Sequence, residues 1–227
     1  MAHRRLTVMI IGLEVKGANE GFARPCKEWL RMSEPVAPER LPDGARFLRS
    51  WIGRPLQIGA VQPSGRALAR AMAGYVDSNI DGPVIEIGPG TGPVTAALLS
   101  KGIPAKRLVL VEFSTEFCAL LRGRFPGAHV VEGDAYELAR SIAPLHLNPA
   151  AAVVSSLPLL TRPVEQRLAL LRQCFSLMHP DAPFIQFTYG TAAPIPATGV
   201  GYIASPSRRI WLNVPPARIW VYRRKFP

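Results

Sequence analysis

Residues 84–92 read Val-Ile-Glu-Ile-Gly-Pro-Gly-Thr-Gly, four mainly apolar residues that run directly into a glycine-rich loop. A short apolar run bounded by glycine is typical of a buried strand, and a helix is predicted from the loop to about Lys101. Glycines in such a strand-to-helix loop let the backbone pass close to a ligand at the carboxyl edge of a parallel sheet. The stretch therefore predicts the first strand of an open α/β sheet, with a ligand site at Gly88, Gly90 and Gly92.

Strands and helices continue to alternate after this loop. Four more short apolar runs predict strands, at residues 108–111, 128–131, 151–154 and 184–189. Helical segments separate them, and one of these is long, at residues 163–178. Nearly continuous apolar strands are typical of a parallel sheet that helices cover on both faces. The final segments, 209–214 and 217–223, are separated only by two prolines, which is too short for a parallel crossover, so we expect them to be antiparallel.

The first 60 residues are predicted to form an arm that precedes a compact domain at residues 61–227. In the arm, Pro42 and Asp43 begin a short helix that Pro55 ends. Its apolar face consists of Leu48, Trp51 and Ile52, with Phe47 beside them. Three arginines flank this face: Arg46, Arg49 and Arg54. This composition predicts an amphipathic helix in the interface of an anionic membrane, although packing on the compact domain is the commoner fate of such helices.

A second helix is predicted directly after Gln62, Pro63 and Ser64. Its apolar positions recur at helical spacing: Leu68, Ala71, Met72, Tyr75 and Val76. This helix is therefore expected to face the core of the domain.

The chain carries 27 lysines and arginines against 16 acidic residues, a formal net charge of +11 at pH 7. Such an excess favours an anionic partner, either nucleic acid or an acidic membrane surface, and does not choose between them. The three cysteines lie far apart without a metal-ligand pattern, so we expect reduced thiols, no metal and a cytoplasmic location. No apolar run approaches the length of a transmembrane helix.

Acidic residues at the ends of the predicted strands indicate what the glycine loop binds. A carboxylate at Glu86 repels a diphosphate but attracts an ammonium or sulfonium group, and a dinucleotide fingerprint would need glycine in place of Pro93. Glu112 ends the second strand and can accept hydrogen bonds from both hydroxyls of a ribose. Asp134 follows the third strand and can accept from the amino group of adenine. An aspartate there is by itself usually a helix cap, but the three acids together favour cofactor binding.

The loop EIGPGTG at residues 86–92, the strand-end Glu112 and the run EGDA at residues 132–135 together resemble motifs of class I S-adenosylmethionine-dependent methyltransferases. More narrowly, the chain is similar to bacterial phospholipid N-methyltransferases, which convert phosphatidylethanolamine stepwise to phosphatidylcholine. Four segments carry this narrower resemblance, at residues 59–72, 155–160, 186–190 and 208–224. The resemblance extends from about Leu41 to the end of the sequence.

The resemblance implies a Rossmann-like α/β fold whose seven mostly parallel strands have the order 3-2-1-4-5-7-6, with the seventh antiparallel. It also implies S-adenosylmethionine as the cofactor, with contacts from the region of Gln62 and Ser64. The other predicted cofactor contacts lie in the loop and at the strand ends: Glu86, Gly88, Gly90, Gly92, Glu112, Phe113, Asp134, Ala135 and Ser155. The expected partners are a phospholipid substrate and an anionic membrane surface, which places the protein peripherally on the inner face of the cell membrane. Nucleic acid is not favoured, and no protein partner is implied.

Three residues are predicted to contact the acceptor. Tyr189 ends a predicted strand and so lies at the ligand edge, where a purely structural buried aromatic is the alternative. Tyr202 is predicted to lie in a long loop, residues 190–207, that covers the substrate, and an aromatic face there can hold a methylated cation. Arg209, or its neighbour Arg208, is predicted to pair with the lipid phosphate, although a solvated strand end explains either arginine alone.

Two other functions stay open at this point. The glycine loop and the Pro63-Ser64 pair also resemble ribosomal RNA adenine N6-dimethyltransferases, and the positive charge suits them. Those enzymes carry an Asn-Leu-Pro-Tyr-like motif after the fourth strand, whereas residues 155–160 read Ser-Ser-Leu-Pro-Leu-Leu and supply neither the amide nor the stacking ring. The second alternative is a non-catalytic protein that docks on membranes through its basic arm, and the complete set of cofactor residues argues against it.

Overall fold

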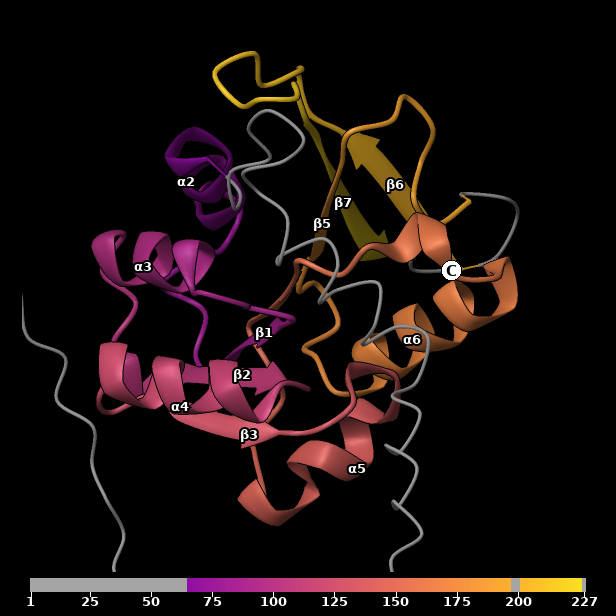
Figure 1. Ribbon diagram of the computed structural model, residues 1–227. Coiled ribbons are helices and arrows are strands. Elements are labelled where there is room, and N and C mark those ends of the chain that lie inside the picture. Colours follow the sequence, from indigo (N-terminus) through magenta and orange to yellow (C-terminus); the bar gives the residue numbers. More distant parts are fainter. Residues whose placement is uncertain (1–64, 197–200, 226–227) are drawn as a thin grey trace, which may run out of the picture. The chain divides into compact units, whose positions relative to one another are not determined.

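The computed structural model describes residues 65–196 and 201–225 (Figure 1). The predicted arm helix at residues 42–54 lies outside the described residues, and so do the predicted cofactor contacts Gln62 and Ser64. Their roles stay predictions.

Within the described residues, seven strands form one sheet (Figure 1). The strands are β1 (Val84–Ile87), β2 (Leu108–Glu112), β3 (His129–Glu132), β4 (Ala152–Ser155), β5 (Phe184–Thr188), β6 (Tyr202–Pro206) and β7 (Arg218–Arg224). Their order is β3-β2-β1-β4-β5-β7-β6, and β7 runs antiparallel to both of its neighbours while the other pairs are parallel. The predicted fold class, strand order and antiparallel seventh strand are confirmed.

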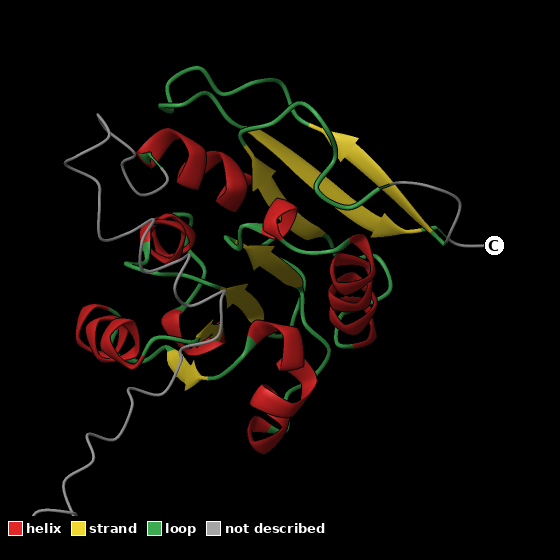
Figure 2. Ribbon diagram, turned by 45° about the vertical axis from the view of Figure 1, so that its right-hand side comes forward, coloured by secondary structure: helices red, strands yellow, loops and turns green. Residues whose placement is uncertain are grey.

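Helices cover both faces of this sheet (Figure 2). One face packs against α2 (Arg66–Gly74), α3 (Pro93–Ser100) and α4 (Thr115–Arg124), and the other against α5 (Leu138–Ile142) and α6 (Val164–Ser176). Short 3-10 turns occupy residues Ala105–Arg107, Ala135–Glu137, Ala143–Leu145 and Leu159–Thr161. In the part of the chain that the structure describes, no helix is long and apolar enough to cross a membrane.

Alternation along each strand divides the core between the two faces. Val84 packs on the side of α2 and α3, whereas its neighbour Ile85 packs on the side of α6. Every residue of β1, β2, β4 and β5 is buried, which explains why these strands are apolar almost without interruption. On α2, the predicted core positions Leu68 and Met72 are fully buried, and so is Val76 just after the helix, but Tyr75 is exposed.

The last hairpin differs from its prediction. The predicted strand at residues 209–214 is wrong, because the partner of β7 is β6, and only Ile210 of that segment makes a bridge, to Ala217. Pro215 and Pro216 have no N–H group to donate, so a ladder cannot continue through them to a tight turn. The strand therefore forms earlier in the chain, where residues 202–206 can pair along β7.

Candidate cofactor and acceptor site

Buried polar residues gather at the carboxyl ends of the strands. In a core made almost wholly of apolar side chains, Glu86, Glu112, Ser155, Gln186 and Thr188 are all buried at or next to these ends. The strand ends are in register, since Ile87 pairs with Val111 and with Ser155. A buried polar group needs a hydrogen-bond partner, so such a cluster marks this edge as the place where the fold makes a site.

The glycine loop is held by its backbone conformation and by close packing. Gly88, Gly90 and Gly92 have φ values of +68°, +56° and +81°, which favour glycine. A Cβ at Gly88 would lie 2.7 Å from Leu157 Cδ2, and a Cβ at Gly92 would meet the ring of Phe125. A Cβ at Gly90 would have nothing within 4 Å. The backbone at Gly90 therefore borders open space, as a loop that lies against a ligand requires.

Glu112 fastens this loop to the end of β2. The side chain is 1% exposed, and its Oε2 accepts a hydrogen bond from the Gly90 N–H at 3.0 Å. Its Oε1 accepts from the N–H groups of Phe113 at 2.9 Å and Ser114 at 3.0 Å. A carboxylate has about four acceptor positions, so three of them already serve the backbone. Glu112 thus shapes the loop, and its predicted contact with a ribose stays a prediction.

Glu86 lies fully buried beneath the same loop. Its Oε2 accepts a 2.6 Å hydrogen bond from the hydroxyl of Thr95 on the first turn of α3, while its Oε1 has no hydrogen-bond partner among the described residues. Burial raises the pKa of Glu86 to about 7, the Thr95 hydrogen bonds lower it in part, and the Glu112 carboxylate raises it. A cation placed near Oε1 would stabilise the charged form, which suits an ammonium or a sulfonium group.

The ends of β2 and β3 lie side by side and carry the predicted adenosine contacts. Glu112 pairs with Glu132, so Phe113 and Asp134 follow neighbouring strand ends. Asp134 Oδ1 accepts from the Tyr136 N–H at 2.8 Å and caps the turn Ala135–Glu137, as aspartates in this position often do. Asp134 is exposed and Ala135 is buried, while the ring of Phe113 is 46% exposed. An exposed ring beside an accessible carboxylate can stack on a purine and accept from its amino group.

Gln186 is a site residue that the sequence analysis missed. It is buried in β5, and its amide donates to the carbonyl oxygens of Leu157 at 3.0 Å and Phe187 at 2.8 Å. It therefore fixes the segment that follows β4, where the Oγ of the buried Ser155 accepts from the Leu157 N–H at 3.4 Å. A glutamine inside an otherwise apolar strand was the signal that would have found it.

A pocket of about 220 Å³ opens beyond the ends of β4 and β5. Its lining consists of residues 156–161, residues 187–190 and Pro194, and most of these side chains are apolar. Tyr189 packs edge-on against Phe187 with ring centroids 5.4 Å apart. The Tyr189 hydroxyl is buried and faces the Asn213 side chain; burial raises the pKa of Tyr189, and the contact with Asn213 lowers it in part. The pocket can therefore take an apolar group, with the ring of Tyr189 in its wall.

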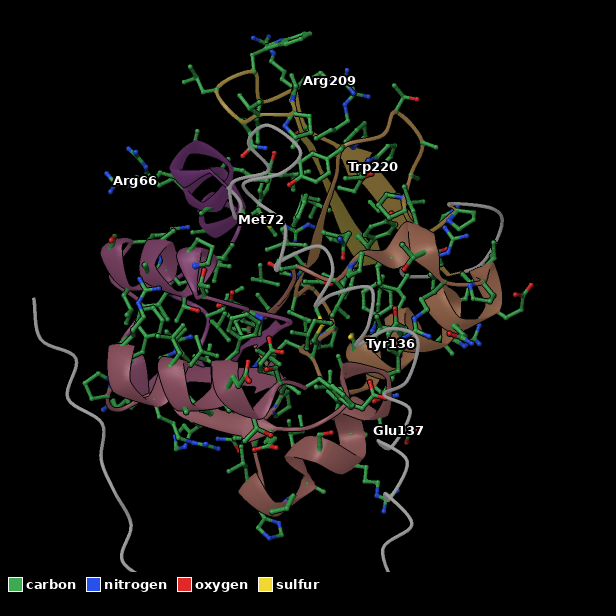
Figure 3. All side chains as sticks on the ribbon, in the orientation of Figure 1. Arg66, Met72, Tyr136, Glu137, Arg209 and Trp220 are labelled. Atoms are coloured by element: carbon green, nitrogen blue, oxygen red, sulfur yellow. The ribbon has the colours of Figure 1, made fainter. Side chains whose placement is uncertain are left out.

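The structure brings Arg209 to this pocket and separates Tyr202 from it. Arg209 donates from Nη2 to the Tyr189 carbonyl oxygen at 3.3 Å, and Figure 3 shows Arg209 at the outer end of the β6–β7 hairpin. Tyr202 does not lie in a covering loop, because it begins β6 and pairs with Arg224 at the opposite edge of the sheet. Its ring packs near Phe175 and Tyr222, and its hydroxyl donates to the Pro196 carbonyl oxygen. Tyr202 therefore has a structural position, since it pairs with β7 and its ring joins an aromatic cluster.

Comparison with known proteins identifies the class to which this arrangement belongs. Residues 84–181 match a family described as a methyltransferase domain. The solved O-methyltransferase from Bacillus cereus in complex with SAH has the same fold, with a TM-score of 0.55, 14% identity and coverage of 84% of this chain and 94% of that one. The ornithine lipid N-methyltransferase of Singulisphaera acidiphila is 30% identical over 145 residues, which are 63% of this chain and 76% of that protein. The chain belongs to the class I S-adenosylmethionine-dependent methyltransferases, and S-adenosylmethionine is its cofactor.

Methyltransferases of RNA are also among its relatives. Ribosomal RNA small subunit methyltransferase A of a Synechococcus species is 50% identical over 54 residues, 22% of this chain and 18% of that protein. The protein of the same name from Geobacter sulfurreducens is 33% identical over 116 residues, 49% of this chain and 41% of that protein. The similarity to these proteins thus covers less than half of their length.

The site fits S-adenosylmethionine. Open space borders the backbone at Gly90, and one oxygen of the buried Glu86 has no partner among the described residues. Both observations are at the end of β1, between the exposed Phe113 and Asp134 on one side and the pocket on the other. S-adenosylmethionine carries an ammonium and a sulfonium, which suit the carboxylate of Glu86, and a nucleoside, which suits Phe113 and Asp134.

Proposed function

We propose that this protein transfers methyl groups from S-adenosylmethionine to the amine of a lipid head group, with phosphatidylethanolamine and its methylated forms as the acceptors. The observation that carries the proposal is the pocket beyond β4 and β5, whose lining is mostly aliphatic or aromatic and includes Tyr189, to whose carbonyl oxygen Arg209 donates. The similarity to an ornithine lipid N-methyltransferase supports an amine on a lipid as the acceptor.

The main chemical task at such an acceptor is to present an uncharged nitrogen. A primary amine of pKa about 10.4 costs on the order of 4 to 5 kcal/mol to hold neutral at pH 7. A mostly apolar pocket lowers this cost because desolvation disfavours the ammonium form. The remaining task is alignment, since the nitrogen lone pair must attack in line with the bond that breaks. No covalent enzyme intermediate is needed.

Each group at the site then has a defined part. When bound, the cofactor supplies an electrophilic methyl group on a sulfonium. Glu86 faces its positive charge, and Glu112, Phe113 and Asp134 hold the nucleoside. Tyr189 lines the pocket, accepts a hydrogen bond from the amine through its hydroxyl, and supports the nitrogen with its ring face once methylation has made it a permanent cation.

Arg209 supplies the contact for the lipid phosphate. Its guanidinium is already placed beside the Tyr189 carbonyl oxygen, so a phosphate bound there would hold the amine near the tyrosine hydroxyl. The peripheral position on the inner face of the cell membrane, with the arm helix at residues 42–54 as an anchor, is part of the same proposal. The charge of +11 supports it because anionic lipids attract a basic protein.

Methylation of adenine in ribosomal RNA is the second candidate, and the RNA methyltransferase relatives favour it. Against it stands the segment after β4, which presents Leu157, Leu159 and Leu160 to the pocket and no amide or aromatic ring. A flipped base needs both hydrogen-bonding and stacking partners.

One experiment separates the candidates. The protein is incubated with S-adenosylmethionine that carries a labelled methyl group, liposomes that contain phosphatidylethanolamine and an equal mass of ribosomal RNA, and the products are then separated. We expect label in the mono-, di- and trimethylated lipid. Label in the RNA with none in the lipid would overturn the proposal, and cofactor binding without any labelled product would favour the non-catalytic alternative.

A further inference from the structure

The loop between β6 and β7 exposes large apolar side chains. We call residues 207–217 the β6–β7 tip (Figure 1, yellow loop at the top). Trp211 is 71% exposed, Leu212 87% and Val214 66%. Single exposed apolar residues are ordinary on a protein surface, but three on four consecutive positions form a patch that calls for a partner.

Hydrogen bonds fix the backbone of the tip, so the exposure of these side chains is not a result of fraying. Asn213 is 2% exposed, its Oδ1 accepts from the Gly65 N–H at 2.7 Å, and its Nδ2 donates to the Pro215 carbonyl oxygen at 2.8 Å. Ile210 and Ala217 close the base of the tip with a pair of backbone hydrogen bonds. The buried amide of Asn213 thus holds its neighbours Leu212 and Val214 outward.

The charge around the tip identifies the partner. Arg208 and Arg209 precede the apolar residues, and Arg218 follows them. No acidic residue occurs in the sequence after Asp181, so nothing in the tip or its strands offsets these cations. Tryptophan and aliphatic side chains ringed by arginine suit the interface of an anionic bilayer, where rings and chains enter below the head groups and guanidinium groups meet phosphates. A second copy of the same surface is disfavoured because two cationic tips repel each other.

The tip and the acceptor pocket lie at the same edge of the sheet. Thr188 at the end of β5 pairs with Arg218 at the start of β7, and the end of β6 at Pro206 pairs with Trp220. Arg209 in the tip donates to the carbonyl oxygen of Tyr189 in the pocket. A bilayer that receives the tip would therefore lie at the mouth of the pocket.

We propose that the β6–β7 tip inserts Trp211, Leu212 and Val214 into the interface of an anionic lipid bilayer and so brings the pocket to the head groups. The role given to the docking, delivery of the pocket to its substrate, rests on the proposed lipid acceptor. The docking itself does not, because membrane binding and methyl transfer can be measured separately. It also assigns to the tip a membrane contact additional to the one proposed for the arm helix.

The test uses the full chain and the double variant Leu212→Ser with Val214→Ser, which keeps the Trp211 ring that lies against the Arg209 guanidinium. Both side chains are exposed, so the variant should keep the wild-type unfolding temperature and cofactor affinity. We expect its binding to vesicles of phosphatidylglycerol and phosphatidylcholine, measured by co-flotation, to be at least about tenfold weaker than that of the wild type. The matched control is Ile203→Ser, which removes a 50% exposed apolar residue from β6 away from the tip and should float normally.

A second measurement separates this inference from the proposed function. Methyl transfer is assayed with phosphatidylethanolamine in vesicles and with a short-chain form that stays monomeric in solution. We expect the double variant to lose activity on vesicles about tenfold and to keep it on the monomeric acceptor. If neither protein methylates any lipid but the variant still fails to float, the proposed function fails and the tip stands as a membrane contact.

Two results would overturn the inference. One is that the double variant floats as the wild type does, which would leave the arm helix or another surface as the anchor. The other is that the wild type is a dimer that the double substitution converts to a monomer without a change in flotation, which would make the tip an interface between two copies.

Discussion

The two halves of the sheet edge present opposite environments to a ligand. At the ends of β1, β2 and β3, carboxylates are held by the protein itself, since Glu112 accepts three backbone N–H groups and Asp134 one. At the ends of β4 and β5, the pocket is mostly apolar, and burial raises the pKa of Tyr189 in its wall. One half is organised by hydrogen bonds that already exist, and the other by the exclusion of water.

This difference predicts how the two halves respond to substitution. Groups that hold the loop in place are also part of the fold, so their loss should lower both stability and cofactor affinity. Groups that line the pocket carry few bonds within the protein, so their loss should alter rate and acceptor preference while the fold survives. The predictions below test this division, beginning with the largest effect.

Gly92→Ala should have the largest effect on stability. Its φ of +81° costs an alanine about 1 to 2 kcal/mol, and the new Cβ would overlap the ring of Phe125, for which overpacking costs about 1 to 3 kcal/mol more. Chemical denaturation should therefore show a loss of about 2 to 5 kcal/mol. Gly102→Ala is the control, because its φ is +98° but a Cβ there meets nothing within 4 Å. Equal losses in the two variants would mean that packing does not hold the loop.

Glu112→Ala and Asp134→Ala should separate loop support from ligand contact. Removal of the Glu112 carboxylate leaves three N–H groups without an acceptor, which should lower the free energy of unfolding by about 3 kcal/mol. Loss of the Asp134 cap should cost only about 1 kcal/mol. Both variants should bind S-adenosylmethionine about ten- to a hundredfold more weakly by calorimetry. Unchanged affinity in both would refute the assignment of the cofactor site.

Tyr189→Phe should change the rate without harm to the fold. The hydroxyl is buried beside Asn213, whose amide already makes hydrogen bonds to Gly65 and Pro215, so its removal should change the unfolding temperature little. We expect kcat/KM to fall about tenfold for the unmethylated amine, which loses an acceptor for its N–H groups. No such fall is expected for the dimethylated amine, which in its uncharged form has no N–H group to donate. The same loss for both acceptors would contradict a role of the hydroxyl in orienting the amine.

The smallest predicted effect is a pH dependence of cofactor affinity that comes from Glu86. Its pKa in the folded protein, about 7, lies above the ordinary value of 4.5, so the folded state favours the protonated form. This group therefore stabilises the fold most below pH 4.5, and that contribution is lost as the pH rises through 7. A cationic cofactor prefers the charged form, so its binding should release a proton and strengthen by up to about tenfold between pH 6 and 8.

Glu86→Gln provides the control for this dependence. The amide oxygen can still accept from the hydroxyl of Thr95, so the fold should be kept while the titration is removed. Calorimetry in buffers of different ionisation enthalpy should then detect no proton release near pH 7. A variant that keeps the full pH dependence would show that another group titrates.

Short sequence motifs predicted which residues lie at the ends of β1, β2 and β3. The loop at residues 84–92, the acids that end β1 and β2, and Asp134 after β3 each follow from one short motif on one strand end. The strand order followed from the family resemblance, and the sheet has it. In contrast, the strand partner of β7 was misassigned because the apolar run at residues 209–214 has strand composition, and only the missing N–H groups of Pro215 and Pro216 argue against it.

The residues that escaped prediction act through distant contacts. Tyr202 has its place because β7 needs a partner and Phe175 and Tyr222 offer an aromatic cluster, none of which is visible near residue 202 in the sequence. Gln186 supports a segment 29 residues away, and Asn213 binds Gly65 across 148 positions. No periodicity or motif encodes such pairs, because each half of the pair is unremarkable without the other.

The bond between Gly65 and Asn213 also sets an order of events during synthesis of the protein. The Gly65 N–H at the start of α2 leaves the ribosome 148 residues before its acceptor, so this hydrogen bond cannot form until residue 213 has been made. The β1–β3 part of the sheet can form in the meantime, because all of its strands lie between residues 84 and 132. The start of α2 is therefore among the first parts of the domain to be translated and among the last to be completed.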